Sequence, residues 1–256
     1  MAIRRSNRKQ DSAAEQALGQ FLDRYFYPRL TKRADFQWHR HADKETQIQG
    51  IDVDITFNSG SQRTRTLFVD EKAALQYVNS KRLKTFALEL TFINSSGIES
   101  DGWFINDSLK TEYYLLIWPK ASIDGRPARA SDLGRLSRDD FTQLLACFIS
   151  KKRLTSWLAD QGLDAGKLKE IAVELRAITD PSKPYKEKLD DGLSIYCSAG
   201  AESQSDLKRR RLVERPINLL VSRSILIELA HDTYLISKSE LKRMSDGSLA
   251  DDPWTE

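Results

Sequence analysis

Two short apolar runs that carry acidic residues at strand spacing, 51–57 and 67–72, constrain the fold of this chain most strongly. Side chains alternate between the two faces of a strand, so both runs place ionisable residues opposite an apolar face. The polar residues 58–63 between them have the composition of a turn that joins antiparallel neighbours. The sequence therefore predicts a β-hairpin with one buried face and one ionisable face.

The ionisable face holds Asp52 and Asp54 from the first run and Asp70 and Lys72 from the second. A loop centred on Ser61 would place Asp52 opposite Asp70, at the roughly 4.8 Å spacing of neighbouring strands. A shift of the centre by one residue would pair Asp54 with Asp70 instead. The hairpin pattern alone leaves both registers open.

Carboxylates directly opposite one another destabilise a strand pair, and a divalent cation would remove that conflict. Magnesium takes oxygen ligands, usually one or two carboxylates together with water and a phosphate oxygen. Lys72, on the same face, would then orient a water molecule or offset charge on the phosphate. The alternative is that this face is merely solvated.

These residues resemble the motif of the PD-(D/E)xK nucleases, the restriction-endonuclease-like superfamily. Gly50 and Asp52 match its Gly-x-Asp strand, and Asp70 and Lys72 match its Asp-x-Lys strand. Ile51 stands where many members have the proline of the family's name. The resemblance implies an α/β fold with a mixed central sheet flanked by helices, and metal-dependent hydrolysis of phosphodiester bonds in nucleic acid.

By this resemblance Asp52 and Asp70 would be metal ligands, with the backbone carbonyl of Glu71 as a further ligand. Lys72 would be the water-positioning residue. The cofactor would be Mg²⁺, with Mn²⁺ as a substitute. Asp54 is the reserve candidate for the first ligand.

The resemblance covers residues 11–80 and includes an expected amphipathic helix at 12–26, ahead of the hairpin. Family members often add a glutamate from such a helix, and Glu15 lies at the corresponding place. The alternative is a capping box over 12–15, in which Glu15 satisfies the start of the helix. Gln76, in a helix expected after Lys72, is a weaker candidate whose simpler interpretation is an exposed polar residue.

Net charge is only +3, so composition alone does not identify a nucleic-acid partner. The basic residues are nevertheless clustered, and such clusters bind phosphates through an electrostatic attraction that is largely independent of sequence. Each cluster alone is also typical of a solvated surface. The clusters that we assign to nucleic-acid binding are Lys81, Arg82 and Lys84, which follow the motif, and Arg209, Arg210 and Arg211.

The remaining pattern predicts three segments. Residues 1–135 would form the N-terminal part of a nuclease core, with further strands at 86–93 and 112–118 that extend the hairpin sheet. Residues 136–184 would be a helical subdomain or insertion. Residues 185–256 would add strands and a short helix that complete the core, followed by a frayed tail.

The helical prediction rests on apolar residues at helical spacing after residue 139, beginning with Phe141, Leu144, Leu145 and Phe148. Farther along, strand-like patterns occupy 193–197, 217–221 and 233–236, with a short helix at 225–230.

Only two cysteines are present, Cys147 and Cys197, so a disulfide framework or a cysteine-based zinc site is not expected. No apolar run is long enough to span a bilayer, and a cytoplasmic location follows by default. His39 and His41 lie two residues apart without further ligands at zinc spacing, and we interpret them as polar surface residues.

Two functional classes remain. The first is a Mg²⁺-dependent endonuclease acting on DNA, with RNA as a lesser variant. The second is a non-catalytic nucleic-acid-binding or assembly protein that keeps a nuclease-like scaffold. Nucleic acid is the expected partner in both classes and a membrane in neither; a homodimer is one assembly state that the sequence leaves open.

Overall fold

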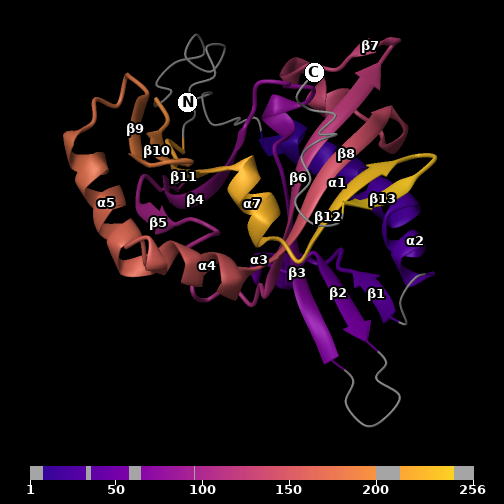
Figure 1. Ribbon diagram of the computed structural model, residues 1–256. Helices are drawn as coiled ribbons and strands as arrows, with labels where there is room; N and C mark the ends of the chain where they lie inside the picture. The colour runs from indigo at the N-terminus through magenta and orange to yellow at the C-terminus, as the bar shows by residue number, and fades with distance from the viewer. Residues whose placement is uncertain (1–7, 33–35, 58–64, 95, 200–213, 245–256) are drawn as a thin grey trace. The chain divides into compact units, whose positions relative to one another are not determined.

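The computed structural model describes residues 8–32, 36–57, 65–94, 96–199 and 214–244 (Figure 1). The chain forms two compact units. The hairpin unit comprises the described residues of Arg8–Lys84, Leu109–Lys152 and Leu226–Glu256. The inserted unit comprises the described residues of Thr85–Ser108 and Arg153–Ile225, so it interrupts the hairpin unit twice along the chain. These bounds differ from the three segments predicted from the sequence.

A mixed sheet forms the centre of the hairpin unit. Its strand order is β1-β2-β3-β6-β8-β12-β13, and β7 pairs with β6 beside this path. Only β3 and β6 run parallel among the described neighbours of this sheet. The strands are β1 (Phe36–Arg40), β2 (Val53–Phe57), β3 (Arg65–Ala73), β6 (Tyr113–Ile123), β7 (Arg126–Pro127), β8 (Phe141–Ser150), β12 (Asp232–Ser237) and β13 (Leu241–Met244).

Helices flank this sheet. They are α1 (Arg8–Tyr25), α2 (Tyr27–Thr31) and α3 (Lys44–Ile48), with 3₁₀ turns η1 (Leu75–Tyr77), η2 (Ala130–Arg135) and η3 (Arg138–Asp140). A further helix, α7 (Arg223–Leu229), begins in the inserted unit and ends in the hairpin unit. The apolar stripe of α1, which includes Leu18 and Phe21, packs in one buried cluster with Ile55 of β2 and Val69 of β3. Burial of each such side chain contributes about 1.5 to 3 kcal/mol, which fixes α1 on one face of the hairpin.

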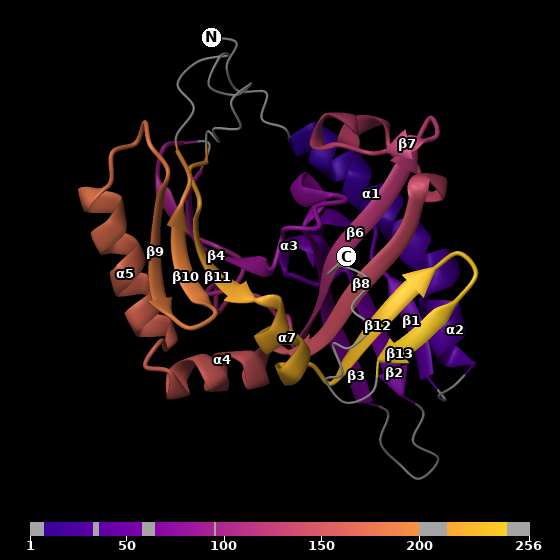
Figure 2. The same cartoon turned by 45° about the horizontal axis from the view of Figure 1, so that its top comes forward.

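The inserted unit contains a second, fully antiparallel sheet. Its order is β5-β4-β11-β10-β9, formed by β4 (Thr85–Ile93), β5 (Glu99–Asp101), β9 (Tyr185–Asp190), β10 (Leu193–Cys197) and β11 (Ile217–Ser222). Figure 2 shows α5 (Ala165–Ile178) running along this sheet, with α4 (Lys151–Asp160) before it in the chain. The buried residues of α5, Leu168, Ala172 and Leu175, give the helix one apolar face.

Most predicted elements are confirmed, but the predictions for residues 141–150 and for the sheet that β4 joins are wrong. Residues 141–150 form a strand, β8, instead of a helix. Strand β4 exists as predicted but belongs to the sheet of the inserted unit, so it does not extend the hairpin sheet. The strands expected at 112–118, 193–197, 217–221 and 233–236 correspond to β6, β10, β11 and β12, and the helix expected at 225–230 corresponds to α7.

Both cysteines are buried, and they do not form a disulfide with each other. None of the described helices is both long and apolar enough to cross a membrane.

Candidate functional site

The hairpin register brings two acidic residues together. Val53 of β2 lies opposite Val69 of β3, so Asp52 and Asp70 are the next residues in the same register. The backbone amide of Asp52 donates to the Val69 carbonyl at 2.9 Å, which continues the pairing beyond the strand end. Asp54 lies opposite Phe68. Of the two registers that the hairpin pattern left open, the one with Asp52 opposite Asp70 forms, and the one that pairs Asp54 with Asp70 does not. The loop residue Ser61 lies outside the described residues.

Asp70 is a buried carboxylate with an incomplete set of partners. Its side chain is 2% exposed, and Oδ1 lies 2.7 Å from the Lys72 Nζ. Within the described part of the chain, Oδ2 is buried and has no hydrogen-bond partner. Burial raises the pKa of Asp70 to about 7, because desolvation outweighs the favourable charge of Lys72 and nearby Asp52 adds repulsion. A buried carboxylate oxygen without a donor is costly, which points to a cation or donor supplied by a ligand.

Lys72 remains positively charged in this setting. Burial alone would lower the pKa of its amine, but the carboxylates of Asp70, Asp52 and Glu15 raise it above its usual value. A lysine that holds its proton this firmly acts as a hydrogen-bond donor and a positive charge, not as a base.

Glu15 approaches the same group from α1. The helix begins at Arg8, so residues 12–15 lie in its interior and the capping-box alternative is wrong. Desolvation by the surrounding protein raises the pKa of Glu15, although part of its side chain is exposed. The positive charge of Lys72 opposes this rise in pKa, and the negative charge of Asp52 adds to it. Glu15 therefore lies at the rim of the group, where its carboxylate interacts with Lys72.

Gly50 is required by the chain path that presents Asp52. It adopts a φ of +75°, and a Cβ atom here would lie 2.5 Å from Oγ1 of Thr111. That hydroxyl donates to the Gly50 carbonyl at 2.7 Å. The close approach ties the start of β2 to the segment that enters β6, so the glycine of the Gly-x-Asp pattern has a structural cause.

Asp54 is engaged elsewhere on the ionisable face. Its Oδ2 lies 3.0 Å from Nε2 of His41. The backbone amide of His41 donates to the Asp52 carbonyl at 2.9 Å. The imidazole ring of His41 contacts the ring of His39. His41 is 18% exposed, so it forms part of a polar cluster beside Asp52, contrary to the simple surface residue that we predicted.

Two parts of the site were not predicted from the sequence. Tyr114 of β6 lies beside Asp70 in the parallel pairing and is fully buried; burial, with a smaller contribution from Asp70, raises the pKa of its hydroxyl. Glu71 turns its side chain to the other face, where Tyr27 and Arg40 bind it. The alternation of faces predicts both orientations, but not the partners, which come from distant segments.

The donor set suits a hard cation that keeps part of its hydration shell. Among the described residues, no group of three or more His, Cys, Asp or Glu side chains is arranged to hold a metal ion. Two carboxylates, Asp52 and Asp70, with a backbone carbonyl at Glu71, are nevertheless the kind of partial oxygen set that Mg²⁺ accepts when water and phosphate complete it. The unpartnered Oδ2 of Asp70 fits such an ion.

The predicted basic cluster next to the motif is exposed. Lys81, Arg82 and Lys84 follow η1, which is a short 3₁₀ turn and not the helix expected there. Gln76 in this turn is exposed and donates to Asp11 at 2.6 Å, which supports the simpler interpretation of it. The second cluster, Arg209, Arg210 and Arg211, lies outside the described residues.

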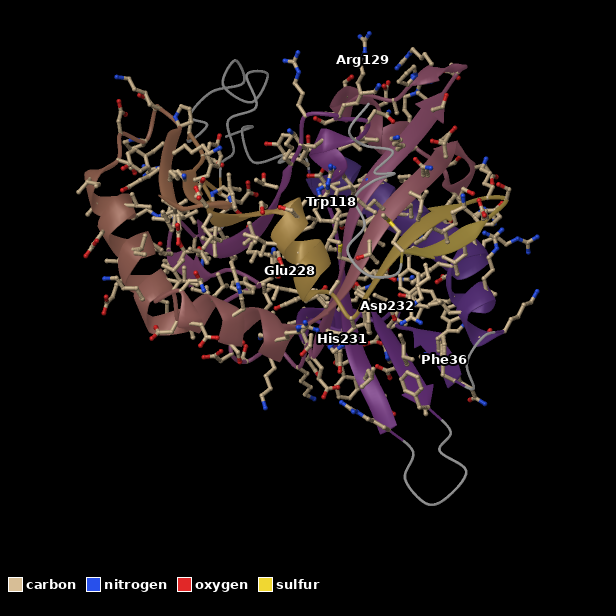
Figure 3. The ribbon with its side chains drawn as sticks, viewed as in Figure 1. Phe36, Trp118, Arg129, Glu228, His231 and Asp232 are labelled. Atoms are coloured by element: carbon tan, nitrogen blue, oxygen red, sulfur yellow. The ribbon has the colours of Figure 1, made fainter. Side chains whose placement is uncertain are left out.

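Asn79 anchors the segment that carries the first cluster. Its amide Nδ2 donates to the carbonyls of Ala121 at 2.7 Å and Ala128 at 2.9 Å. Arg129 follows Ala128 directly and is exposed; Figure 3 shows it at the outer edge of the hairpin unit, near β7. Arg129 is therefore a further cation for this surface that the sequence pattern did not indicate.

Comparisons of this chain with protein-family models, curated proteins and solved structures find no match.

Proposed function

We propose that this protein is a metal-dependent nuclease that hydrolyses phosphodiester bonds, acting as an endonuclease on DNA, with a restriction-endonuclease-like fold. The observation that carries the proposal is the convergence of Asp52, Asp70 and Lys72 on one face of a hairpin, with a buried oxygen of Asp70 left without a partner. The mixed sheet flanked by helices is compatible with that fold.

Each residue has a separate role in this proposal. Asp52 and Asp70 hold the cation, and the Glu71 carbonyl completes the protein ligands. A bound Mg²⁺ would polarise the phosphate and lower the pKa of a water molecule. Lys72 donates a hydrogen bond to that water or to a phosphate oxygen, and its charge offsets the negative charge that develops there.

Glu15 and the exposed cations act around this centre. Glu15, at the rim, interacts with Lys72 by charge and would accept a hydrogen bond from a water molecule on a bound cation. Lys81, Arg82 and Lys84 contact the nucleic-acid backbone, where phosphate contacts position a duplex without reading its sequence. Arg129 extends this surface.

The alternative is a non-catalytic nucleic-acid-binding or assembly protein, and one observation favours it. Lys72 already pairs with Asp70 at 2.7 Å, so much of the buried charge is balanced without a metal. Under this alternative the protein binds nucleic acid but cleaves none at any metal concentration.

Cleavage of supercoiled plasmid DNA tests the proposal. We expect nicked and linear products with Mg²⁺ or Mn²⁺ and none with EDTA, since a closed circle reports internal cleavage. Asp70→Ala and Lys72→Ala should each lower the cleavage rate by at least about a thousandfold, because they remove transition-state stabilisation. The control variant Gln76→Ala should cleave at the wild-type rate. Circular dichroism checks that each variant is folded. Full activity of either site variant contradicts the assignment, and a parallel assay on RNA distinguishes the substrate.

A further inference from the structure

A buried charged cluster lies on the face of β3 opposite the candidate metal centre. The guanidinium of Arg40 donates to both oxygens of Glu71, at 2.8 and 2.9 Å, and the Tyr27 hydroxyl donates to Oε1 of Glu71 at 2.5 Å. Nε of Arg40 also contacts both oxygens of Asp23 at 2.8 Å. These contacts join α1, α2, β1 and β3 of the hairpin unit.

The Arg40 contact is built into the packing of α1. A Cβ atom at Gly19 would lie 3.2 Å from the Arg40 guanidinium carbon, so a larger residue at position 19 would displace the guanidinium group. The Glu71 side chain is only 9% exposed, and Arg40 is 24% exposed. Paired, planar, charge-assisted hydrogen bonds in such a setting hold a carboxylate in one orientation.

Glu71 also connects this cluster with the opposite face through its own backbone. Its amide donates to Oδ2 of Asp52 at 2.8 Å. The Glu71 carbonyl is the third ligand in the proposed metal set. Glu71 also lies directly between Asp70 and Lys72 in the sequence. A displacement of the Glu71 backbone would therefore move several groups of the centre together, and the anchored side chain restrains that displacement.

We propose that Arg40 and Tyr27 are positioning residues, which hold the Glu71 side chain so that its backbone fixes Asp52 and Asp70 for metal binding. This inference rests on the proposed function, because it assigns the cluster a role in that metal centre. Outer partners of metal ligands typically change metal affinity by about 10 to 100-fold when they are removed.

Calorimetric titration with Mn²⁺ tests the inference without a cleavage step. We expect Arg40→Gln to weaken Mn²⁺ binding by about 10 to 100-fold, and Tyr27→Phe, which removes one donor only, to cause a loss near the lower end of that range. The matched control is Arg126→Gln, because Arg126 forms the same fork with Asp132, at 2.8 and 2.9 Å, away from the proposed centre. This control should bind Mn²⁺ as the wild type does.

Removal of Arg40 leaves the Glu71 charge buried without its main partner, which could unfold the protein. The double variant Arg40→Met/Glu71→Met avoids that problem, because apolar residues replace both charges while the Glu71 backbone remains. We expect this variant to melt cooperatively and still to bind Mn²⁺ about 10 to 100-fold more weakly than wild type. Raised Mn²⁺ should restore part of its cleavage rate, which a loss of folding would not allow.

The outcomes separate the two proposals. Wild-type affinity in folded Arg40→Gln, Tyr27→Phe and the double variant overturns the positioning role and leaves the nuclease proposal standing. An equal loss in Arg126→Gln also overturns the role, because the effect would then be general. A wild-type protein that neither binds Mn²⁺ nor cleaves DNA overturns both proposals.

Discussion

At the scale of single residues, the choice between Asp52 and Asp54 is the sharpest prediction. Asp52 follows the register next to Asp70, whereas Asp54 pairs with His41. Asp52→Asn should eliminate turnover and weaken Mn²⁺ binding by at least about tenfold, and Asp54→Asn should leave both largely in place. Calorimetry on the two variants measures this. A lost isotherm for Asp54→Asn together with a normal one for Asp52→Asn would reverse the assignment.

Asp70 predicts an unusual pH dependence for the metal-free protein. Burial raises its pKa from 3.8 to about 7. Between these pH values the folded protein holds a proton that the unfolded chain has lost, so the free energy of unfolding falls as pH rises through this window. Asp70→Asn should remove this slope, because the amide does not titrate in this window.

Urea unfolding in EDTA from pH 4 to pH 8 measures the effect. Other groups with raised pKa values, such as Glu15, remain in both proteins, so the difference between the two curves isolates Asp70. Parallel curves for wild type and Asp70→Asn would show that the carboxyl is not held in its neutral form.

The residues that could be predicted are those fixed by local geometry. Parity within one hairpin places Asp52, Asp54, Asp70 and Lys72 on one face without any distant contact. The resemblance to the Gly-x-Asp motif then favours Asp52 over Asp54. Tyr114 and Arg40 depend on pairings between segments far apart in the chain, which strand alternation does not encode. The sequence therefore predicts the centre of the candidate site but not its supporting contacts.

At the scale of elements, Gly50 tests how the start of β2 is held. Gly50→Ala should destabilise the protein by about 2 to 4 kcal/mol, because it adds left-handed strain and displaces the Thr111 hydroxyl from a buried hydrogen bond. Gly125 is a matched control, with φ +74° and no atom within 4 Å of an added Cβ. Gly125→Ala should cost only the strain, about 1 to 2 kcal/mol.

Thermal and urea unfolding of both glycine variants gives the comparison. Equal losses would show that the contact between Gly50 and Thr111 contributes nothing beyond backbone conformation. A larger loss at Gly50 supports the tie between β2 and the segment that enters β6.

Strand β8 shows why one element was mispredicted. Three of the four residues at helical spacing, Leu144, Leu145 and Phe148, lie within the continuous apolar run 144–149. A strand in the middle of a sheet buries both of its faces, so its sequence is a nearly continuous apolar run. Hydrophobic periodicity does not distinguish such a run from a buried helix. Strand β8 lies between β6 and β12, which explains its composition. For β4, the local pattern was sufficient to predict a strand. It carries no information about which sheet that strand joins.

At the scale of the whole molecule, the basic clusters predict salt-dependent binding to long duplex DNA. Each phosphate contact adds about 0.9 to the slope of log affinity against log salt. Replacement of Lys81, Arg82 and Lys84 by alanine should therefore reduce the slope by up to about 3. Fluorescence anisotropy across a salt series measures it, and replacement of Arg209, Arg210 and Arg211 should flatten the slope in the same way.

The control for this experiment removes the same charge from cations that already have acidic partners. Arg135, Arg138 and Lys167 pair with Asp124, Asp139 and Glu170 respectively. Their combined replacement by alanine should leave the slope nearly unchanged. An unchanged slope after loss of a basic cluster would assign that cluster to a solvated surface.

Anomalous diffraction from a crystal soaked in Mn²⁺ tests the central claim most directly. We expect one strong peak about 2.0 to 2.3 Å from carboxylate oxygens of Asp52 and Asp70 and from the Glu71 carbonyl, within the range for oxygen ligands of such ions. The peak should vanish in Asp70→Asn. A peak bound by Asp54 and His41 instead, or a well-ordered hairpin without any peak at saturating Mn²⁺, would contradict the account.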